Sequence, residues 1–153
     1  MRHLATAGAI LLALLFAGAA PASAAHRHPI PSGRGAIVDL VTAAARRHGV
    51  PTRLALAIVD VESGFNPHAR NGTSTGLGQI KPGTARDAGC HGSLWTAAAN
   101  ADCSARILAV LLRDARGDWR RAAAHYNQGR FARGSAGAGY ARLVLARARR
   151  MAA

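Results

Sequence analysis

From residue 36 onward, apolar residues recur at the spacing of an amphipathic helix. The first stripe comprises Ile37, Leu40, Val41 and Ala44. Their i, i+3, i+4, i+7 spacing places them on one helix face. Gly49 ends this predicted helix, and Pro51 is suited to begin another because its missing N–H costs nothing in a first turn. The second helix has a buried stripe formed by Leu54, Ile58 and Val61.

Further helices are indicated after a polar connection. Residues 64–79 are rich in Gly, Asn, Ser and Thr, which predicts a long loop or a small hairpin, and loops of this length are often functional. A short helix is expected over 82–89 and a longer one over 100–116. The apolar face of the longer helix is made of Cys103, Ile107, Val110 and Leu111.

The C-terminal part of the chain continues the helical pattern. Asp118 is a suitable N-cap for a helix. Its apolar side would hold Trp119, Ala122, Ala123 and Tyr126. A Gly/Ser-rich loop over 129–139 precedes a last helix marked by Tyr140, Leu143, Val144 and Arg147. No strand-like alternation stands out, so one mainly α domain over 36–150 is predicted, with a thin core because many of its apolar residues are Ala.

The N-terminus has the pattern of a secretory signal peptide over 1–25. Arg2 supplies a positive charge, an apolar run extends from Leu4 to Ala20, and Ala22-Ser23-Ala24 offers small residues for cleavage. We expect cleavage after Ala24 or Ala25. An uncleaved membrane anchor is the alternative, but the run is shorter than the ~20 residues that a span needs. Residues 26–35, with Pro, Gly and His, would form a flexible leader.

The chain has two cysteines, Cys90 and Cys103. Export implies an oxidising periplasm or exterior, where an even pair of cysteines favours a disulfide. Closing a loop of this length would contribute about 3 kcal/mol in the chain-entropy model. No metal-ligand spacing such as CxxC or HxxxH occurs, so neither a metal nor a cofactor is expected.

The net charge of +13 comes almost entirely from arginine, and Lys81 is the sole lysine. Nucleic-acid binding would fit this charge, but export argues against it. An exported basic protein would instead meet an anionic wall polymer or membrane surface. Alternatively, the positive charge reflects scattered surface arginines that need no partner, such as Arg113, Arg116 and Arg120.

Glu62 is the one glutamate among seven acidic residues. It follows Ile58 by four positions and therefore borders the apolar face of the second predicted helix. Asp60, two positions earlier, points elsewhere, so these acids do not form a local pair. An acid at a helix C-terminus is disfavoured by the helix dipole, which gives a purely structural role little support.

Three separated segments carry a family resemblance. They are Glu62-Ser63-Gly64-Phe65-Asn66-Pro67, then residues 75–85 with Gly76-Leu77-Gly78-Gln79, then Ala124-His125-Tyr126-Asn127-Gln128-Gly129. In this order they resemble the lytic transglycosylases of the soluble-lytic-transglycosylase (SLT) type, which share a goose-lysozyme-like helical fold. The resemblance covers roughly 36–150.

The resemblance implies a peptidoglycan substrate, cleaved between N-acetylmuramic acid and N-acetylglucosamine, with Glu62 as the catalytic acid. The family's Gly-Leu-Met-Gln motif falls on residues 76–79, with Gly78 where Met is usual, a change expected to remove a side chain from the groove floor. The substrate-binding residues implied are Ser63, Gly78, Gln79, Tyr126, Asn127 and Tyr140.

The acid inventory favours one-carboxylate chemistry. Ordinary glycoside hydrolysis uses two carboxylates, yet no Asp or Glu lies between Ser63 and Gln79, and the next acid is Asp87. Glu62, kept protonated by an apolar surround, could donate a proton to the bridging oxygen and then accept one from the sugar's C6 hydroxyl. The product would be a 1,6-anhydro ring, formed without water, as the family's chemistry implies.

Each site residue also has a structural interpretation. Gln79 could satisfy backbone groups, Tyr126 could be a core aromatic and Asn127 a helix C-cap. His125 is expected on the surface, and core packing is favoured over sugar stacking for Phe65 and Trp95.

Two other functions stay open. One is a hydrolytic muramidase of the same fold, and the other is a basic wall-binding module without activity. A monomer is expected. Wall turnover, opening the wall for a secretion or conjugation apparatus, and attack on a competitor's wall all fit the sequence.

Overall fold

The computed structural model describes residues 33–129, 135 and 137–151. The predicted signal peptide, most of the predicted leader, and residues 130–134 and 136 of the predicted Gly/Ser loop lie outside the described residues. Within the described ranges, no helix is both long and apolar enough to cross a membrane.

The described residues are mainly α, as predicted. The helices are α1 (Arg34–Arg47), α2 (Thr52–Ser63), α3 (Pro82–Asp87), α4 (Ala97–Asp114), α5 (Trp119–Gln128) and α6 (Ala138–Arg150). The polar stretch after α2 contains a small hairpin, in which β1 (Arg70–Asn71) pairs antiparallel with β2 (Ser74–Thr75) around Gly72 and Thr73. Gly72 has φ 57°, a conformation that glycine adopts without steric cost.

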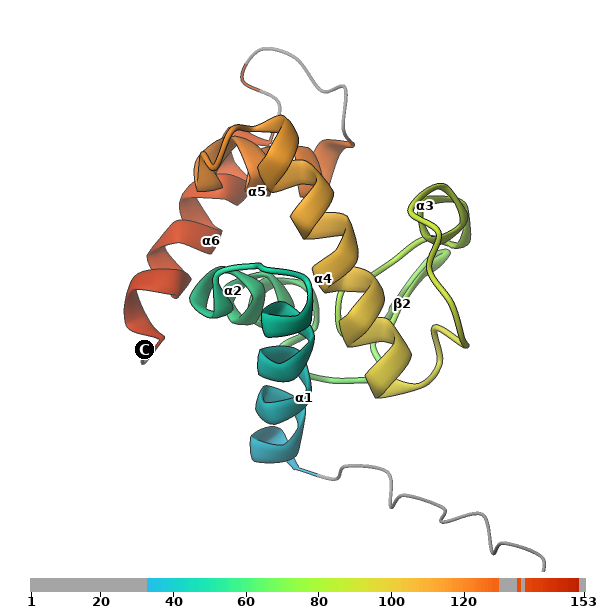
Figure 1. The fold of residues 1–153 in the computed structure, drawn as a ribbon. Helices are drawn as coiled ribbons and strands as arrows, with labels where there is room; N and C mark the ends of the chain where they lie inside the picture. The colour runs from blue at the N-terminus through green and yellow to red at the C-terminus, as the bar shows by residue number, and fades with distance from the viewer. Residues whose placement is uncertain (1–32, 130–134, 136, 152–153) are drawn as a thin grey trace, which may run out of the picture.

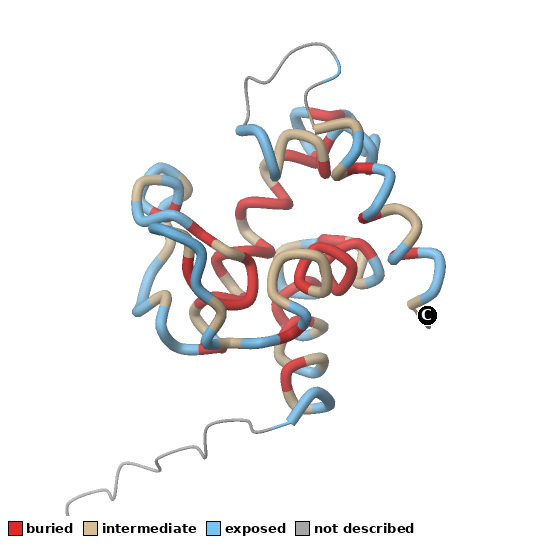
Figure 2. Tube along the Cα trace, turned by 180° about the vertical axis from the view of Figure 1, so that it is seen from behind, coloured by how far each residue is buried: buried red, intermediate tan, exposed pale blue. Residues whose placement is uncertain are grey.

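Helix α2 lies at the centre of the fold. In Figure 1, α6 lies on one side of α2, and the lobe of β1, β2 and α3 lies on the other side, beyond α4. The residues of α2 from Leu54 to Val59 are all buried, and Figure 2 shows this buried centre. Leu54 and Ile58 are 0% exposed, and burying side chains of this size contributes about 1.5–3 kcal/mol each.

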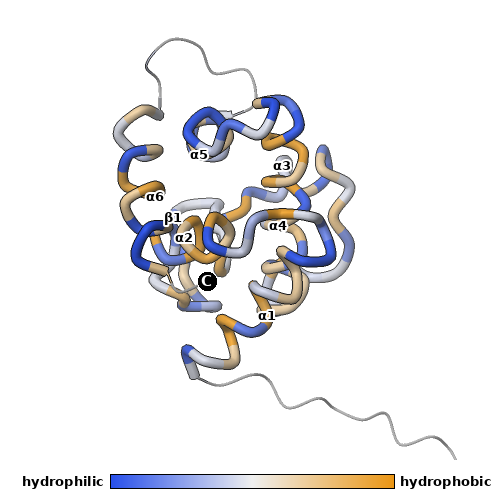
Figure 3. Tube along the Cα trace, turned by 60° about the vertical axis from the view of Figure 1, so that its left-hand side comes forward, coloured by the Kyte–Doolittle hydropathy of each residue, from blue (hydrophilic) through white to orange (hydrophobic). Residues whose placement is uncertain are grey.

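The remaining core is built largely from alanine, as the composition indicated. The fully buried alanines include Ala44, Ala45, Ala57, Ala122, Ala123 and Ala141. Small side chains allow neighbouring helices to approach closely. In Figure 3 hydrophobic positions are concentrated along the central helices α2 and α4, whereas α5 is mostly hydrophilic.

Several element ends differ from the prediction. Helix α1 begins at Arg34, inside the predicted leader. Arg34 pairs with Asp60 and its guanidinium lies 4.3 Å from the Phe65 ring centroid, so tertiary contacts hold a first turn that has no apolar pattern. Helix α4 begins at Ala97, because the Thr96 side chain accepts a hydrogen bond from the Ala99 N–H.

Candidate active site

Glu62 lies in the last turn of α2, just before Gly64, whose left-handed conformation ends the helix. Its side chain is largely buried, and burial raises the pKa of the carboxyl because the ionised form loses water. A hydrogen bond from Tyr140 acts in the opposite direction and lowers the pKa, but the net direction is upward. An acid with a raised pKa is suited to donating a proton.

Tyr140 is the partner of Glu62. Its hydroxyl donates a hydrogen bond of 2.6 Å to Glu62 Oε1 from α6, 78 residues away in sequence. Burial, and then the nearby charge of Glu62, raise the pKa of Tyr140, which keeps its hydroxyl protonated as a donor. Tyr140 was predicted to bind substrate, which stays a prediction. In the structure its hydroxyl is hydrogen-bonded to the candidate acid.

The other acidic residue of α2 is held away from this contact. Asp60 forms ion pairs with Arg34 at 3.4 Å and Arg147 at 3.3 Å, so it joins the first turn of α1 to α6. This agrees with the prediction that Asp60 and Glu62 point apart. Among the described residues, no other carboxylate shifts the pKa of Glu62.

The loop after the hairpin is fixed by Asn100, a residue of α4 that is only 1% exposed. Its amide nitrogen donates to the carbonyls of Thr75 and Leu94, both at 2.9 Å, and its oxygen accepts from the Gly78 N–H at 2.9 Å. A Cβ on Gly76 would lie 2.2 Å from this amide nitrogen, so glycine is required there. Asn100 therefore ties three backbone segments together.

Tyr126 holds the same loop from the other side. Its hydroxyl donates to the Gly78 carbonyl at 3.0 Å and lies 2.8 Å from Ser104 Oγ. Burial raises the pKa of Tyr126, as does the charge of Glu62, while the hydrogen bond with Ser104 lowers it. Tyr126 is therefore half-buried, with its hydroxyl held between the loop and α4.

Gly78 does not face an open groove. It is buried, and a Cβ added there would point at Ser104 and Tyr126. The expectation that Gly78 removes a side chain from the groove floor is therefore wrong. A side chain at this position would meet the hydroxyl groups of Ser104 and Tyr126. The backbone N–H and C=O of Gly78 both have hydrogen-bond partners within the protein.

The other predicted site residues make local contacts. The Gln79 side-chain amide nitrogen donates to the carbonyls of Ala69 at 3.1 Å and Gly76 at 3.0 Å, which fits the backbone-satisfying interpretation. The Ser63 hydroxyl donates to the Val59 carbonyl at 3.0 Å. Asn127 is exposed and is not the C-cap, a position that Gly129 occupies. Substrate roles for these three side chains stay predictions.

The packing of several aromatic and apolar residues was harder to foresee. Phe65 is buried, as predicted. Trp95 is 54% exposed, so the expectation of a core role was wrong, and the Arg70 guanidinium lies 4.3 Å from its ring centroid. His125 is half-buried, not on the surface, and its Nδ1 lacks a hydrogen-bond partner in the described structure. Leu143 of α6 is 46% exposed, because a 13-residue helix on the outside of the fold buries one side only.

Sequence reasoning missed Asn100 and Ser104. Both lie on the buried side of α4, four residues apart, as polar residues within an apolar stripe. Buried polar side chains need hydrogen-bond partners, so their position in that stripe was the available signal. The stripe alone did not show that their partners are the loop at Gly78 and Tyr126.

Cys90 and Cys103 form the predicted disulfide, with Cα atoms 5.3 Å apart. It joins the segment after α3 to α4, one residue before Ser104. The described residues contain no group of three or more His, Cys, Asp or Glu placed to hold a metal ion.

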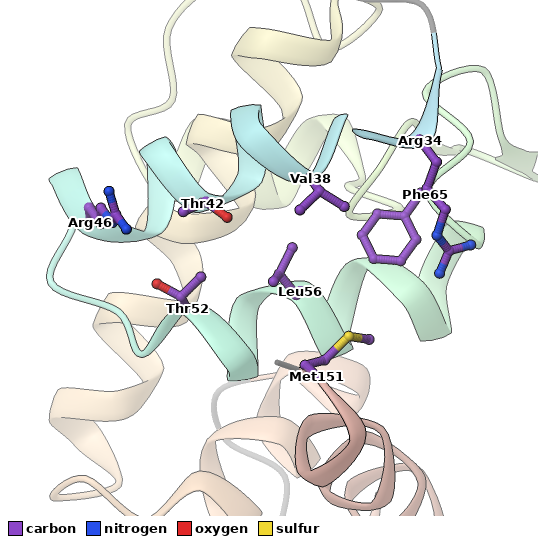
Figure 4. Close-up of a pocket in the computed structure, with 8 residues that line it drawn as sticks. All are labelled: Arg34, Val38, Thr42, Arg46, Thr52, Leu56, Phe65 and Met151. Atoms are coloured by element: carbon purple, nitrogen blue, oxygen red, sulfur yellow. The ribbon is translucent and has the colours of Figure 1, made fainter. Parts of the chain in front are cut away.

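Two hollows in the described part of the chain do not include Glu62. The larger, about 380 Å³, lies between α1 and α2. Figure 4 shows Val38 of α1 and Leu56 of α2 facing each other across its middle, with Arg34 and Phe65 at one end and Arg46 at the other. The smaller, about 190 Å³, is lined by Trp119 and Leu145 between Arg53 and Arg149. The candidate acid is thus separate from both hollows.

Comparisons with known proteins identify the family and the fold. The model of the transglycosylase SLT domain family matches residues 39–142. No curated protein matches the sequence. Two solved structures are similar in fold, each with a TM-score of 0.64.

The first of these structures is an inactive mutant of the lytic transglycosylase Slt from Pseudomonas aeruginosa, at 24% identity over 78% of this chain. The second is the 70 kDa soluble lytic transglycosylase from Escherichia coli, at 23% identity over 72% of this chain. The chain spans about a quarter of the length of each (24% and 23%). Because the family model covers more than half of the chain, the chain belongs to the transglycosylase SLT domain family.

Proposed function

We propose that the protein is a peptidoglycan lytic transglycosylase that cleaves the bond between N-acetylmuramic acid and N-acetylglucosamine and forms a 1,6-anhydro end. The observation that carries this proposal is the state of Glu62. It is a largely buried carboxyl with a raised pKa and a single tyrosine partner, in a chain of the SLT domain family.

The mechanism needs one residue in two roles. Protonated Glu62 gives its proton to the bridging oxygen as the bond from that oxygen to C1 of the muramyl sugar breaks. The C6 hydroxyl oxygen of the same sugar then bonds to C1, and its proton passes to the Glu62 carboxylate. Glu62 returns to its starting state and no water is consumed.

Tyr140 supports both stages in this proposal. Its hydrogen bond occupies Oε1, which assigns the transferred proton to Oε2 and orients the carboxyl. A hydrogen bond to a charged group is stronger than one to a neutral group, so the same contact stabilises the ionised carboxylate after the first transfer.

The acid inventory supports a one-carboxylate reaction over hydrolysis. Retaining and inverting hydrolysis both place a second carboxylate near the acid. Asp60 is engaged by two arginines, and Asp87 is exposed in α3. Neither affects the pKa of Glu62.

The remaining proposals concern place and partners. A wall substrate and the predicted signal peptide support export to the periplasm or exterior. The basic surface suits an anionic wall or membrane surface. Action beside a secretion or conjugation apparatus is one setting in which such an enzyme would open the wall locally.

Mass spectrometry of purified wall sacculi, digested by the chain without residues 1–25, tests the reaction. We expect anhydro-muropeptides from the wild type and from Asp87→Asn, and no products from Glu62→Gln. Reducing-end products that are one water heavier would instead establish a muramidase. If the folded wild type binds sacculi but releases nothing, the wall-binding module is the better account.

A further inference from the structure

We propose that Ser104 is a positioning residue for the Gly76–Gln79 loop and that it acts through Tyr126. We also propose that its side chain, together with the Tyr126 hydroxyl, makes glycine necessary at position 78. Its effect on turnover rests on the proposed function, whereas the coupling between positions 78 and 104 does not.

The hydrogen bonds have a definite order. The Tyr126 hydroxyl has one proton, which it donates to the Gly78 carbonyl at 3.0 Å. Its 2.8 Å contact with Ser104 must therefore be donated by Ser104. Ser104 is only 4% exposed, so water does not readily replace it. Ser104 thus fixes the orientation of the hydroxyl that holds the loop.

The steric relation is equally specific. A Cβ at position 78 would lie 2.7 Å from both Ser104 Oγ and Tyr126 Oη, and 2.8 Å from Ser104 Cβ. Rotating the serine side chain would move Oγ away but would leave Cβ in place. Even alanine therefore requires the loop or α4 to shift, and the Met usual at this position requires a larger shift. Removing the side chain at 104 removes two of these three close atoms.

Tyr126 and this loop belong to two of the three motif segments that carry the family resemblance, and Glu62 belongs to the third. The loop lies between the hairpin and α3, and Tyr126 holds it through the Gly78 carbonyl. The charge of Glu62 also raises the pKa of Tyr126, so we expect a change in the Ser104 hydrogen bond to alter both the loop and the titration of Glu62. Asn100 fixes the Gly78 N–H independently, so loss of the Ser104 hydroxyl should loosen the loop without releasing it.

The kinetic test compares Ser104→Ala with Ser104→Thr, which keeps the hydroxyl. We expect Ser104→Ala to lower kcat about threefold to tenfold, the effect of one lost hydrogen bond, and to displace the pH profile of kcat. Ser104→Thr should restore most of both. Thr42→Ala, a hydroxyl deletion on α1, is the control and should change neither. A Ser104→Ala variant with normal kcat and an unmoved pH profile would overturn the positioning role, even if its Tm is lower.

The coupling is tested by a double-mutant cycle of Gly78→Ala and Ser104→Gly, measured as the denaturant midpoint of unfolding. Glycine weakens a helix by itself, so the Ser104→Gly single variant is the reference. We expect Gly78→Ala to lower the midpoint clearly in the wild type and less in the Ser104→Gly background, where Tyr126 Oη is the one of the three close atoms that remains. Equal losses in both backgrounds would refute the coupling.

The two parts of the proposal fail separately. If the wild type proves inactive, the proposed function fails, and the unfolding cycle still decides whether Ser104 dictates glycine at 78. If the wild type is active but Ser104→Ala is unaffected, the positioning role fails while the proposed function stands.

Discussion

Replacing Tyr140 by phenylalanine removes one hydroxyl group and leaves the ring. That hydroxyl donates the 2.6 Å hydrogen bond to Glu62 Oε1. Because the bond stabilises the ionised carboxylate, it lowers the pKa of Glu62 against the larger upward effect of burial. Tyr140→Phe should therefore raise the pKa of Glu62 further.

The size of the effect on rate follows from the kind of bond. Hydrogen bonds to charged groups contribute roughly 1.5–3 kcal/mol. Glu62 is incompletely buried, so water can replace part of the lost bond, and the lower end of that range applies. A loss of about 1.5 kcal/mol of transition-state stabilisation corresponds to roughly a tenfold fall in kcat.

The assay is the pH profile of kcat on purified sacculi. Glu62 must be protonated at the start of the reaction, so activity falls as the pH rises through its pKa. In Tyr140→Phe this alkaline limb should move to higher pH, while kcat at the optimum falls about tenfold. Thr42→Ala is the comparison, because it removes a hydroxyl on α1, at the hollow that does not include Glu62.

The reasoning would be refuted by an alkaline limb that moves to lower pH or does not move in a well-folded Tyr140→Phe variant. An unchanged kcat would show that the contact neither orients nor stabilises the carboxylate. A profile displaced equally by Tyr140→Phe and by Thr42→Ala would show that general loosening of the fold, and not the loss of this hydrogen bond, is responsible.

Three further predictions concern stability and binding. The folded-state pKa of Glu62 lies above the ordinary value of 4.5, so the stability contributed by the protonated carboxyl is present below pH 4.5 and is lost as the pH rises through the folded-state pKa. Glu62→Gln should therefore have a higher Tm than the wild type at neutral pH, and a difference that persists below pH 4.5 would contradict this. Replacing Cys90 and Cys103 together by serine should lower the free energy of unfolding, measured by denaturant titration, by about 3 kcal/mol. It should also make the stability insensitive to reductant. A loss well under about 1 kcal/mol would show that the crosslink scarcely restricts the unfolded chain. Trp95 is exposed and follows Leu94, whose carbonyl accepts a hydrogen bond from Asn100. Trp95→Ala should raise KM for glycan strands several-fold at unchanged kcat, because sugar stacking is lost. An unchanged KM would place Trp95 outside the binding surface.

The fold was largely predictable because its helices are amphipathic. Residues such as Leu54, Ile58 and Ala122 recur at helical spacing, and the structure buries them. Helix ends were less predictable. Arg34 acts through tertiary contacts with Asp60 and Phe65, and Thr96 acts as a cap, and neither changes the apolar pattern. The exposure of Trp95 was missed because composition does not show which aromatic residues reach the core.

The candidate acid was also visible in the sequence. Glu62 stands out because it is the sole glutamate and because three motif segments occur in order around it. Its surroundings were not visible. The hydrogen bond from Tyr140 to Glu62 was not foreseen, and substrate binding by Tyr140 stays a prediction. Gly78 was expected on a groove floor but is buried against two hydroxyl groups.

Local sequence therefore determined the helices, the choice of Glu62 as candidate acid and the disulfide pair, since helical spacing, residue scarcity and cysteine count are properties of the chain itself. Tertiary structure alone decided the contacts of that acid and of the loop near it. Helical spacing tells which residues share a face but not which faces meet. The hydrogen bond from Tyr140 to Glu62 joins residues 78 positions apart in the sequence, and the hydrogen bond from Tyr126 to Gly78 joins residues 48 positions apart. Both therefore depend on how the helices pack around α2.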